Sequence, residues 1–555
     1  MPGIKKVFKF GGASVKDAAA VRNLADIVKD RVDENIMLVV SAMGKTTNLL
    51  EKILAEYRRC GWTPAQETLQ PLFDYHMGIM SELFPDASHR VYERVENLVG
   101  ELREHLEEHE PDYDRQYDRT VCYGELISTT IVSAYLDSRG ISSTWLDARK
   151  YVVTDRVFRA AGVDWDETAK RIKPLNGLYV PGHVFVVQGF IGGTSDGLDS
   201  TTLGREGSDY TAAIFANCLD AEEVTIWKDV SGLLNADPKR FSDTVKIPRI
   251  SYSEAIELAF YGATIIHPKT IKPLQNKNIR LKVQSFLDPS SDPTVIDGSE
   301  DARSSSREAP VPSYIVKDRQ TLVSISPRDY SFMNEHNLRI IFATCDELHI
   351  HANMMQTSAL MLSICFDYDE AKLKGLLSRL SGRFSVKYNV GLQLFTVRHY
   401  HADGPTPTEE SFLRRKNIIV KQSSRSTLQY VLEYLLILSP SDRERPAFKE
   451  RLKGCSVLYV GSLVSVNQYE SSGAMNSPRR GEKSYCMAAL PTAASWMPGS
   501  LTFSPPFNAR RHFSALAPAL RANEVRRAEP KRYPTFSGMP MEWSVWSFKY
   551  DDERR

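Results

Sequence analysis

The first half of the chain alternates between short apolar runs and longer stretches with helical spacing. The apolar run at residues 36–41 and the β-like runs at residues 6–10, 184–189 and 223–227 predict strands. Residues 17–33 and 208–219 carry apolar side chains at helical spacing, and residues 68–108 are mainly helical in pattern and acidic, as in an element inserted on the surface of a sheet domain. Strands that alternate with helices predict an α/β fold with a mostly parallel sheet over residues 1–290.

The second half has a different pattern. A polar stretch rich in Ser, Asp and Pro predicts a linker at residues 291–313. A smaller α+β region then occupies residues 314–436. Its predicted strands lie at 314–325, 338–343, 359–366, 392–400 and 417–421, its predicted helices at 331–337 and 369–380, and the apolar run 427–432 is compatible with either. Residues 437–555 are rich in Arg, Pro and Ser without a persistent period, which predicts an irregular or disordered tail.

Composition limits the kinds of partner. The 555 residues exceed what one hydrophobic core usually supports. A net charge of +1 gives no global field for nucleic acid or an acidic membrane, so neither is expected as a partner. The N-terminus lacks the apolar core of a signal peptide, and no apolar run approaches the roughly 20 residues that cross a bilayer, so we expect a cytoplasmic protein. The seven scattered cysteines have no metal-ligand spacing, and no metal ligands are assigned.

A pair of glycines at the end of the first predicted strand is the first candidate for chemistry. In Lys9-Phe10-Gly11-Gly12 the glycines let backbone amides approach phosphate oxygens, and the following helix adds partial positive charge. Lys9 supplies a mobile positive charge for a phosphoryl group. A lone Gly-Gly after a strand is a weak signal that an ordinary tight turn explains better, and the segment is neither a Walker A loop nor a Rossmann fingerprint.

Two further segments carry polar and glycine residues near predicted strand ends. Residues 188–194 and 201–210 place two glycine-rich turns around a Thr pair, and Ser208-Asp209 then opens a helix, which suits an anionic ligand. Helix capping by Ser208 or Asp209 is the structural alternative. Residues 227–239 run from a strand end into an Asp-Pro turn, a place where open α/β sheets bind nucleotides, although Asp-Pro-Lys alone is simply a turn.

Together with Ser41-Ala42-Met43-Gly44, Gly124-Glu125 and Asp229-Val230-x-Gly232, these segments occur in the order seen in aspartate kinases, which residues 4–290 resemble. The resemblance implies an amino-acid kinase-like three-layer sandwich followed by α+β ACT-like regulatory domains. It also implies ATP-dependent phosphorylation of the β-carboxylate of L-aspartate, with Mg²⁺, at the first step of lysine, threonine and methionine biosynthesis. The sequence departs from the family at Ala13, Leu234, Lys239 and Thr264, where relatives often have Thr, an aromatic residue, Arg and a nucleotide-contacting Lys.

The resemblance also implies a role for individual residues. Lys9 would contact the transferred phosphoryl group, and Asp209 would organise magnesium and phosphates. Arg205 would clamp the α-carboxylate of aspartate, and Glu125 would meet its ammonium group. The rest of the predicted amino-acid pocket is Ser41, Thr47, Phe190 and Ser208, and the predicted nucleotide contacts are Gly11, Gly12, Lys228, Asp229, Leu234 and Lys239. A carboxylate nucleophile is already ionised at neutral pH, so no general base is expected.

Regulation is implied by the second region. ACT modules in related enzymes pair across a subunit interface and bind an amino acid, so we expect a homodimer or higher homo-oligomer and a possible amino-acid effector near Asn353, Thr357 and Ser358. A dimerisation module that binds nothing is the alternative. Two other functions stay open at this point: an acetylglutamate- or glutamate-type kinase, and an amino-acid sensor without catalytic activity.

Overall fold

A computed structural model describes residues 3–108, 110–263, 266–298, 311–400, 404–414, 416–438 and 456–459. All of these residues belong to one compact unit, residues 1–479. Among them, no helix is both long and apolar enough to span a membrane.

The first region is built on a sheet of eight strands. Its order is β11-β13-β12-β8-β1-β2-β5-β3, and its described neighbours run parallel except β12 and β13. The strands are β1 (Lys6–Phe10), β2 (Ile36–Val40), β3 (Ser143–Leu146), β5 (Val184–Gln188), β8 (Glu223–Lys228), β11 (Arg249–Ser251), β12 (Arg280–Ser285) and β13 (Thr294–Asp297). The mostly parallel sheet predicted from the sequence is confirmed.

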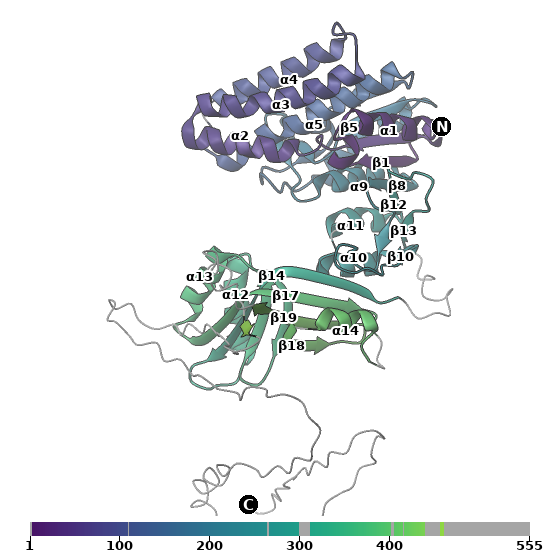
Figure 1. Ribbon diagram of the computed structural model, residues 1–555. Coiled ribbons are helices and arrows are strands. Elements are labelled where there is room, and N and C mark those ends of the chain that lie inside the picture. Colours follow the sequence, from purple (N-terminus) through teal and green to yellow (C-terminus); the bar gives the residue numbers. More distant parts are fainter. Residues whose placement is uncertain are drawn as a thin grey trace, which may run out of the picture. The chain divides into compact units, whose positions relative to one another are not determined.

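Helices cover this sheet. The long helix α5 (Tyr113–Ser138) is buried along nearly its whole length because it packs on β2, β3 and β5 and is itself covered by α2 and α4. Figure 1 shows α2, α3 and α4 lying beside α5, away from the β12–β13 end of the sheet. The helices of this region are α1 (Ala18–Lys29), α2 (Thr46–Cys60), α3 (Trp62–Leu83), α4 (Arg90–Glu107), α5, α6 (Ala148–Tyr151), α7 (Trp165–Ile172), α8 (Leu175–Leu178), α9 (Gly207–Leu219), α10 (Tyr252–Tyr261) and α11 (Pro268–Asn276), with 3₁₀ turns η1 (Gly12–Val15) and η2 (Val32–Glu34).

Two small sheets complete this region. β4 (Val153–Thr154), β6 (Ile191–Thr194) and β7 (Ser200–Thr202) form one, and β9 (Leu233–Leu234) with β10 (Lys246–Ile247) form the other. The hairpin of β6 and β7 leads directly into the segment before α9, so it places residues 203–209.

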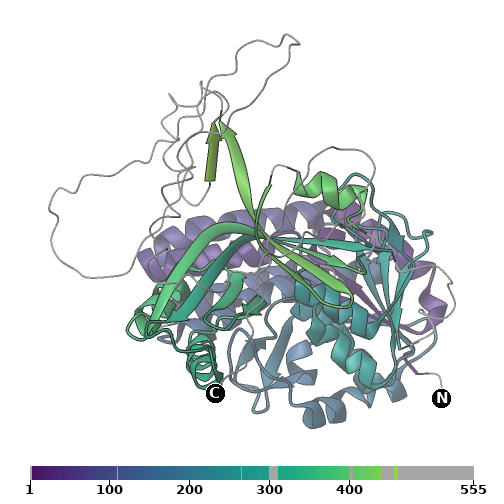
Figure 2. The same cartoon turned by 90° about the horizontal axis from the view of Figure 1, so that it is seen from below.

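The second region is an antiparallel sheet with helices. Its strand order is β15-β16-β14-β17-β19-β18, and the end of β19 pairs in parallel with β20 outside this order. Figure 2 shows the long green strands of this sheet curving along their length. The strands are β14 (Ser313–Pro327), β15 (Ala352–Thr357), β16 (Leu362–Asp367), β17 (Phe384–Arg398), β18 (Lys416–Ser423), β19 (Thr427–Leu438) and β20 (Ser456–Tyr459), and the helices are α12 (Glu335–Glu347), α13 (Glu370–Leu380) and α14 (Pro407–Leu413).

Several sequence predictions in this half need correction. The run 338–343 is not a strand but part of α12, because the buried positions Asn337, Ile341, Thr344 and Cys345 recur at helical spacing. The run 427–432, left open by its pattern, lies in β19 between β17 and β18. The predicted linker contains β13, whose β-branched residues extend the first sheet beside β12.

The predicted tail begins inside β19 and contains β20, and its other residues lie outside the described part. The predicted domain boundaries at residues 290, 313 and 436 remain predictions.

The two regions share contacts. Ala236 forms a bridge with Tyr314, and Phe241 packs with Tyr314 and Phe395 in one apolar cluster. Arg398 of β17, which is buried, pairs its Nη2 with Glu254 Oε2 of α10 at 2.5 Å. Apolar and charged contacts therefore fix the antiparallel sheet to α10 and to residues 236–241 of the first region.

Candidate active site

A cavity of about 560 Å³ lies at the carboxyl ends of β1, β2 and β8 and at the start of α9. The carboxyl ends of parallel strands are where open α/β sheets bind ligands. The lining consists of Lys9, Gly12, Ser41, Ala42, Gly44, Thr47, Tyr117, Glu125, Arg159, Phe190, Gly204, Arg205, Glu206, Gly207, Ser208, Asp209 and Lys228. Residues from five sequence-distant segments that were predicted to carry chemistry therefore meet in one place.

Lys9 is fixed by its strand. β1 is paired on both sides, to β2 and to β8, and Lys9 projects to the face opposite its neighbours Phe8 and Phe10 because strand side chains alternate. Phe10 stacks on Trp227 with ring centroids 5.7 Å apart. The Lys9 side chain is only 10% exposed, and its Nζ lies 2.6 Å from Asp209 Oδ1. The ammonium group is thus held at the cavity by a rigid strand.

Asp209 joins two cations. Its Oδ2 lies 3.7 Å from Lys228 Nζ, in addition to the contact with Lys9. Burial favours the neutral acid, but the charges of Lys9 and Lys228 outweigh it and lower the pKa of Asp209. The carboxylate is therefore ionised at neutral pH and holds both ammonium groups at the same end of the cavity.

The glycine segment after β1 allows close backbone approach. A Cβ on Gly12 would lie 2.8 Å from the Gly44 carbonyl oxygen and 2.9 Å from that of Ala42. Because real Cβ atoms essentially never come this close to a carbonyl oxygen, only glycine lets residues 11–12 pack against residues 42–44. Gly11 lies beside the site, since its Cβ would be 3.3 Å from Lys9 Nζ.

Glu125 reaches the cavity from α5. Its Oε1 accepts a hydrogen bond from the Ala42 amide at 3.3 Å, and its buried Oε2 has no hydrogen-bond partner among the described residues. Burial raises the pKa of Glu125 to about 8, although the Ala42 amide and the charge of Lys9 act in the opposite direction. A buried, unpartnered carboxylate oxygen is costly unless a ligand supplies a donor.

Arg205 lies in a tight turn before α9. Gly204 has φ 77° and Glu206 has φ 55°, so the residues on both sides of Arg205 are in the left-handed region. A Cβ on Gly207 would come within 2.7 Å of the Phe190 ring, which packs the turn against the end of β5. Arg205 is exposed and has no ion pair among the described residues. Its guanidinium group is therefore available to an anionic ligand.

The start of α9 does not need the predicted capping residues. Its N-cap is Glu206, whose side chain makes no capping hydrogen bond. Ser208 and Asp209 both line the cavity, and Asp209 is engaged by Lys9. Helix capping, the structural alternative for Ser208 and Asp209, is therefore not their role in this fold.

Sequence reasoning missed several lining residues. Tyr117 of α5 and Arg159 line the cavity, and the Arg159 guanidinium lies 4.6 Å over the Tyr117 ring. The Arg159 amide donates to the buried Asp118, which also accepts from the amide and hydroxyl of Thr202. Tyr117 and Arg159 lie outside any glycine-rich motif, so nothing local in the sequence marked them. Arg159, Phe190 and Glu206 all have positive φ, and such strain is frequent at functional sites.

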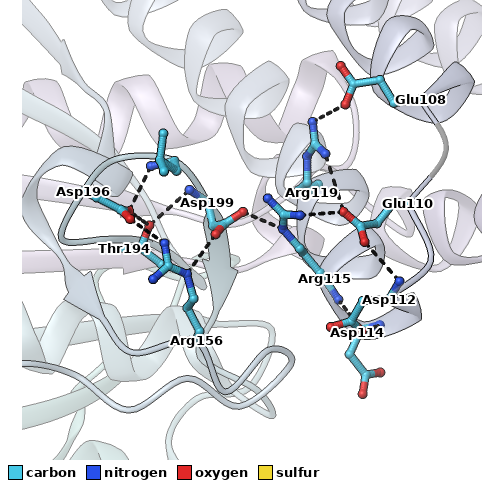
Figure 3. Close-up of polar contacts among 11 residues, drawn as sticks. Glu108, Glu110, Asp112, Asp114, Arg115, Arg119, Arg156, Thr194, Asp196 and Asp199 are labelled. Atoms are coloured by element: carbon cyan, nitrogen blue, oxygen red, sulfur yellow. Dashed lines mark hydrogen bonds and ion pairs between the residues drawn. The ribbon is translucent and has the colours of Figure 1, made fainter.

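A charged network supports this side of the site. Figure 3 shows Arg115 at the start of α5 between Glu110 and Asp199, with contacts of 2.8 and 2.7 Å. Asp199 also accepts from Arg156 Nε at 3.1 Å. The network joins the start of α5 to the β6–β7 hairpin, so it helps to hold residues 203–209 in place.

Some predicted residues lie elsewhere. Among the described residues, the cavity lining does not include Gly11, Asp229, Leu234 or Lys239. The Lys239 amide donates to Asp237 Oδ1 in a turn, as the structural alternative expected. Thr264 lies outside the described residues. Asn353 and Thr357 are on β15 and Ser358 follows it, all in the second region.

The described residues contain no group of three or more His, Cys, Asp or Glu side chains arranged to hold a metal ion. Mg²⁺ commonly binds through one or two carboxylates together with substrate phosphates and water. Asp209 is a carboxylate at the end of the cavity where Lys9 and Lys228 gather. The residues present therefore fit a magnesium ion that arrives with a nucleotide.

Residues 5–285 match the model of the amino acid kinase family. The chain is 30% identical to Aspartokinase 2, chloroplastic, of Arabidopsis thaliana, over 66% of this chain and 67% of that protein. It is 28% identical to bifunctional aspartokinase/homoserine dehydrogenase 1, chloroplastic, of Zea mays, over 68% of this chain and 41% of that protein. The chain thus spans about two thirds of the Arabidopsis protein and less than half of the maize protein.

Solved structures agree. The structure of E. coli aspartokinase III in complex with aspartate and ADP (R-state) has a TM-score of 0.65 and 28% identity, covering 77% of this chain and 96% of that chain. The same enzyme in complex with lysine and aspartate (T-state) has a TM-score of 0.62, covering 77% and 95%. With the parallel sheet and the cavity at its carboxyl edge, these matches place the chain in the amino acid kinase family, and within that family it belongs to the aspartokinases.

Proposed function

We propose that this chain transfers the γ-phosphoryl group of ATP to the β-carboxylate of L-aspartate and forms 4-phospho-L-aspartate. That reaction is the first step of lysine, threonine and methionine biosynthesis. The observation that carries the proposal is the cavity in which Lys9 and Asp209 lie at one end and Glu125 and Arg205 supply opposite charges for a zwitterion. The E. coli relative with aspartate and ADP bound supports the same pair of ligands.

The chemistry follows from the charges in the cavity. The β-carboxylate of aspartate is ionised at neutral pH and attacks the γ-phosphorus in line, which breaks its bond to the β,γ-bridging oxygen and releases ADP, so no general base is required. Lys9 lies where it can neutralise charge on the migrating phosphoryl group, and the Gly11–Gly12 backbone can approach the phosphate oxygens. Mg²⁺, when bound, would neutralise charge on the phosphates, and Asp209 is the residue that would hold it.

Amino-acid selection uses two opposite charges. The Arg205 guanidinium suits bidentate binding of the α-carboxylate. The unpartnered Oε2 of Glu125 suits the α-ammonium group. Acetylglutamate has a neutral amide in place of that ammonium group, so it would leave the ionised Glu125 without a positive partner. Aspartate therefore fits these residues better than an N-acylated amino acid.

A panel of substrates tests the proposal. Purified full-length chain is given ATP and magnesium with aspartate, glutamate or acetylglutamate, ADP release is followed, and the acyl phosphate is trapped with hydroxylamine. We expect turnover and a hydroxamate with aspartate alone. Turnover with acetylglutamate and none with aspartate would reject the proposal, and no turnover with any of them would favour an amino-acid sensor without catalytic activity.

The pH dependence of aspartate use follows from Glu125. Its pKa of about 8 means that the free enzyme holds this carboxyl mostly protonated at pH 7. Because the substrate ammonium group needs the ionised form, ionising Glu125 at pH 7 costs roughly 1 kcal/mol. We expect kcat/KM for aspartate to rise about tenfold per pH unit below pH 7 and to level off above pH 8.

Glu125→Gln provides the control for this profile. The amide does not titrate, so the variant should have lower kcat/KM and little slope between pH 6 and pH 8. A wild-type profile that is flat over the same range would mean that Glu125 does not bind the ammonium group in its ionised form.

Regulation by an amino acid is a second part of the proposal. Asn353, Thr357 and Ser358 are the proposed effector residues, and β15, at one edge of the second sheet, is the proposed pairing surface of a homodimer or higher homo-oligomer. A lysine-bound T-state of the E. coli relative supports lysine as an effector. We expect millimolar lysine or threonine to lower the aspartate kinase rate, and an unchanged rate would leave the second region as a dimerisation module.

The cytoplasmic location remains a prediction. The plant relatives are named chloroplastic.

A further inference from the structure

A fully buried carboxylate on α5 joins two segments that border the cavity. Asp118 Oδ2 accepts hydrogen bonds from the Arg159 amide at 3.0 Å and from the Thr202 amide at 2.8 Å. Its Oδ1 accepts a third hydrogen bond, from the Thr202 hydroxyl, at 2.7 Å. An ionised carboxylate only accepts hydrogen bonds, so it suits three converging donors. One side chain thus holds α5, the loop at Arg159 and the end of β7 together.

The two segments also contact each other just before Arg205. The Ala161 amide donates to the Thr202 carbonyl at 2.9 Å. A Cβ on Gly204 would lie 3.1 Å from the Arg159 carbonyl oxygen, and Gly204 has φ 77°, so glycine permits this close backbone packing. Arg205 follows directly in the chain. The backbone that leads into the proposed α-carboxylate clamp therefore rests on the loop that Asp118 holds.

The loop at Arg159 needs such support. Arg159 has φ 66°, a conformation that persists in a non-glycine residue only where the surroundings impose it. Its guanidinium lies 4.6 Å over the Tyr117 ring, and its Nη1 lies 3.2 Å from Asp114 Oδ1. Tyr117, Asp114 and Asp118 all belong to α5. Both the backbone and the side chain of Arg159 are therefore fixed to this one helix.

The same helix presents the opposite charge of the amino-acid site. Glu125 follows Asp118 by seven residues, which is about two helical turns, so the two carboxylates lie on the same face of α5. Because α5 is buried along nearly its whole length, it has little freedom to shift. The hydrogen bonds of Asp118 thus tie the Arg205 turn to the helix that carries Glu125.

We infer that Asp118 is a positioning residue for amino-acid binding: it holds the turn that carries Arg205 at a fixed place relative to Glu125. The inference rests on the proposed aspartate kinase activity, in which these two residues bind the two charged groups of the amino acid. Asp118 is not part of the cavity lining, so it acts through the residues that it holds. The nucleotide end of the cavity, at Lys9 and Lys228, is not involved.

Steady-state kinetics of Asp118→Ala test the inference, because alanine removes all three acceptor contacts. We expect KM for aspartate to rise about ten- to thirtyfold, with kcat and KM for ATP changed by less than about twofold. Asp118→Asn should restore most of the affinity. Its amide oxygen can accept from both backbone amides, and its amino group can donate to the Thr202 hydroxyl.

A buried carboxylate elsewhere provides the matched control. Glu223 lies at the amino end of β8, whereas Lys228 at the other end of that strand lines the cavity. Its Oε2 lies 2.8 Å from Lys282 Nζ, and the residue is 4% exposed. Glu223→Ala should therefore lower thermal stability, as Asp118→Ala does, but keep a wild-type KM for aspartate.

A double variant shows whether Asp118 acts through Arg205. In the Arg205→Ala background the clamp is already absent, so adding Asp118→Ala should lower kcat/KM for aspartate by less than about threefold. Fully additive losses would mean that Asp118 does not act through Arg205, and they would overturn the inference. Equal losses of kcat and of affinity for both substrates in Asp118→Ala would do the same.

The outcomes separate the two proposals. If the wild-type chain makes no aspartyl phosphate, the proposed function fails and the inference with it. If the wild-type chain is active and a folded Asp118→Ala variant has a wild-type KM for aspartate, the positioning role alone is wrong. If Asp118→Ala does not fold, Thr202→Val decides, because valine removes only the hydroxyl that donates to Asp118. We expect it to raise KM for aspartate about two- to fourfold, and a wild-type KM would overturn the inference.

Discussion

Replacing Lys9 with Met should lower kcat by about 10²- to 10³-fold while leaving KM for ATP within a few fold. Lys9 is held by a strand paired on both sides, and its ammonium group lies 2.6 Å from Asp209 at the cavity. Charge develops on the phosphoryl oxygens during transfer, so a preorganised cation acts mainly on the transition state. Single-turnover ADP release with saturating aspartate and ATP measures this step directly.

The Lys9 variants need a check on folding, because Lys9 and Asp209 form a buried ion pair. Removing one partner of such a pair destabilises a protein by about 3–5 kcal/mol, although Lys228 remains 3.7 Å from Asp209. Thermal unfolding should therefore accompany the kinetics, and Lys9→Arg, which keeps a cation, should retain part of kcat. Lys6→Ala is the control on the same strand, where Lys6 pairs with Glu34 away from the cavity. A folded Lys9→Met variant with wild-type kcat would exclude Lys9 from phosphoryl transfer.

Replacing Arg205 with Ala should raise KM for aspartate by about 30- to 1000-fold, equivalent to about 2–4 kcal/mol. Arg205 is exposed in its turn between two residues with positive φ, and it has no ion pair among the described residues. The truncation therefore breaks no described salt bridge and should barely alter unfolding. Lys at this position keeps the charge but loses the planar fork, so Arg205→Lys should fall between wild type and Ala.

A substrate analogue identifies which carboxylate Arg205 binds. Isoasparagine keeps the β-carboxylate nucleophile and the ammonium group but has an amide at the α position. The wild-type enzyme should use aspartate far better than isoasparagine, and Arg205→Ala should lose most of this preference. Arg171→Ala, at a half-buried arginine of α7 paired with Glu167, should keep the preference. If Arg205→Ala discriminates as strongly as wild type, Arg205 binds another group.

The local pattern of apolar and polar residues was sufficient to predict the strands and helices whose surroundings are uniform along their length. The strands at residues 6–10 and 223–227 are mostly apolar and almost entirely buried because they lie in the middle of a parallel sheet covered on both faces. The pattern failed for residues 338–343, which are apolar except for Arg339 and fit a strand or a helix. The packing of Ile341 and Cys345 decided for the helix. Strand β13 was missed because it is short and lies in a polar stretch of the sequence. Its pairing with β12, which the sequence does not show, stabilises it.

The sequence by itself determined the glycine turns, the lysine at the end of the first strand and the motif around Arg205, because these depend on backbone conformation and on residues close along the chain. Only the tertiary structure decided that Tyr117 and Arg159 complete the cavity, that Asp209 holds Lys9 and Lys228, and that Asp118 joins Arg159 to Thr202. Those contacts join residues far apart along the chain. They depend on how sheets and helices pack, which a local pattern of side chains does not predict.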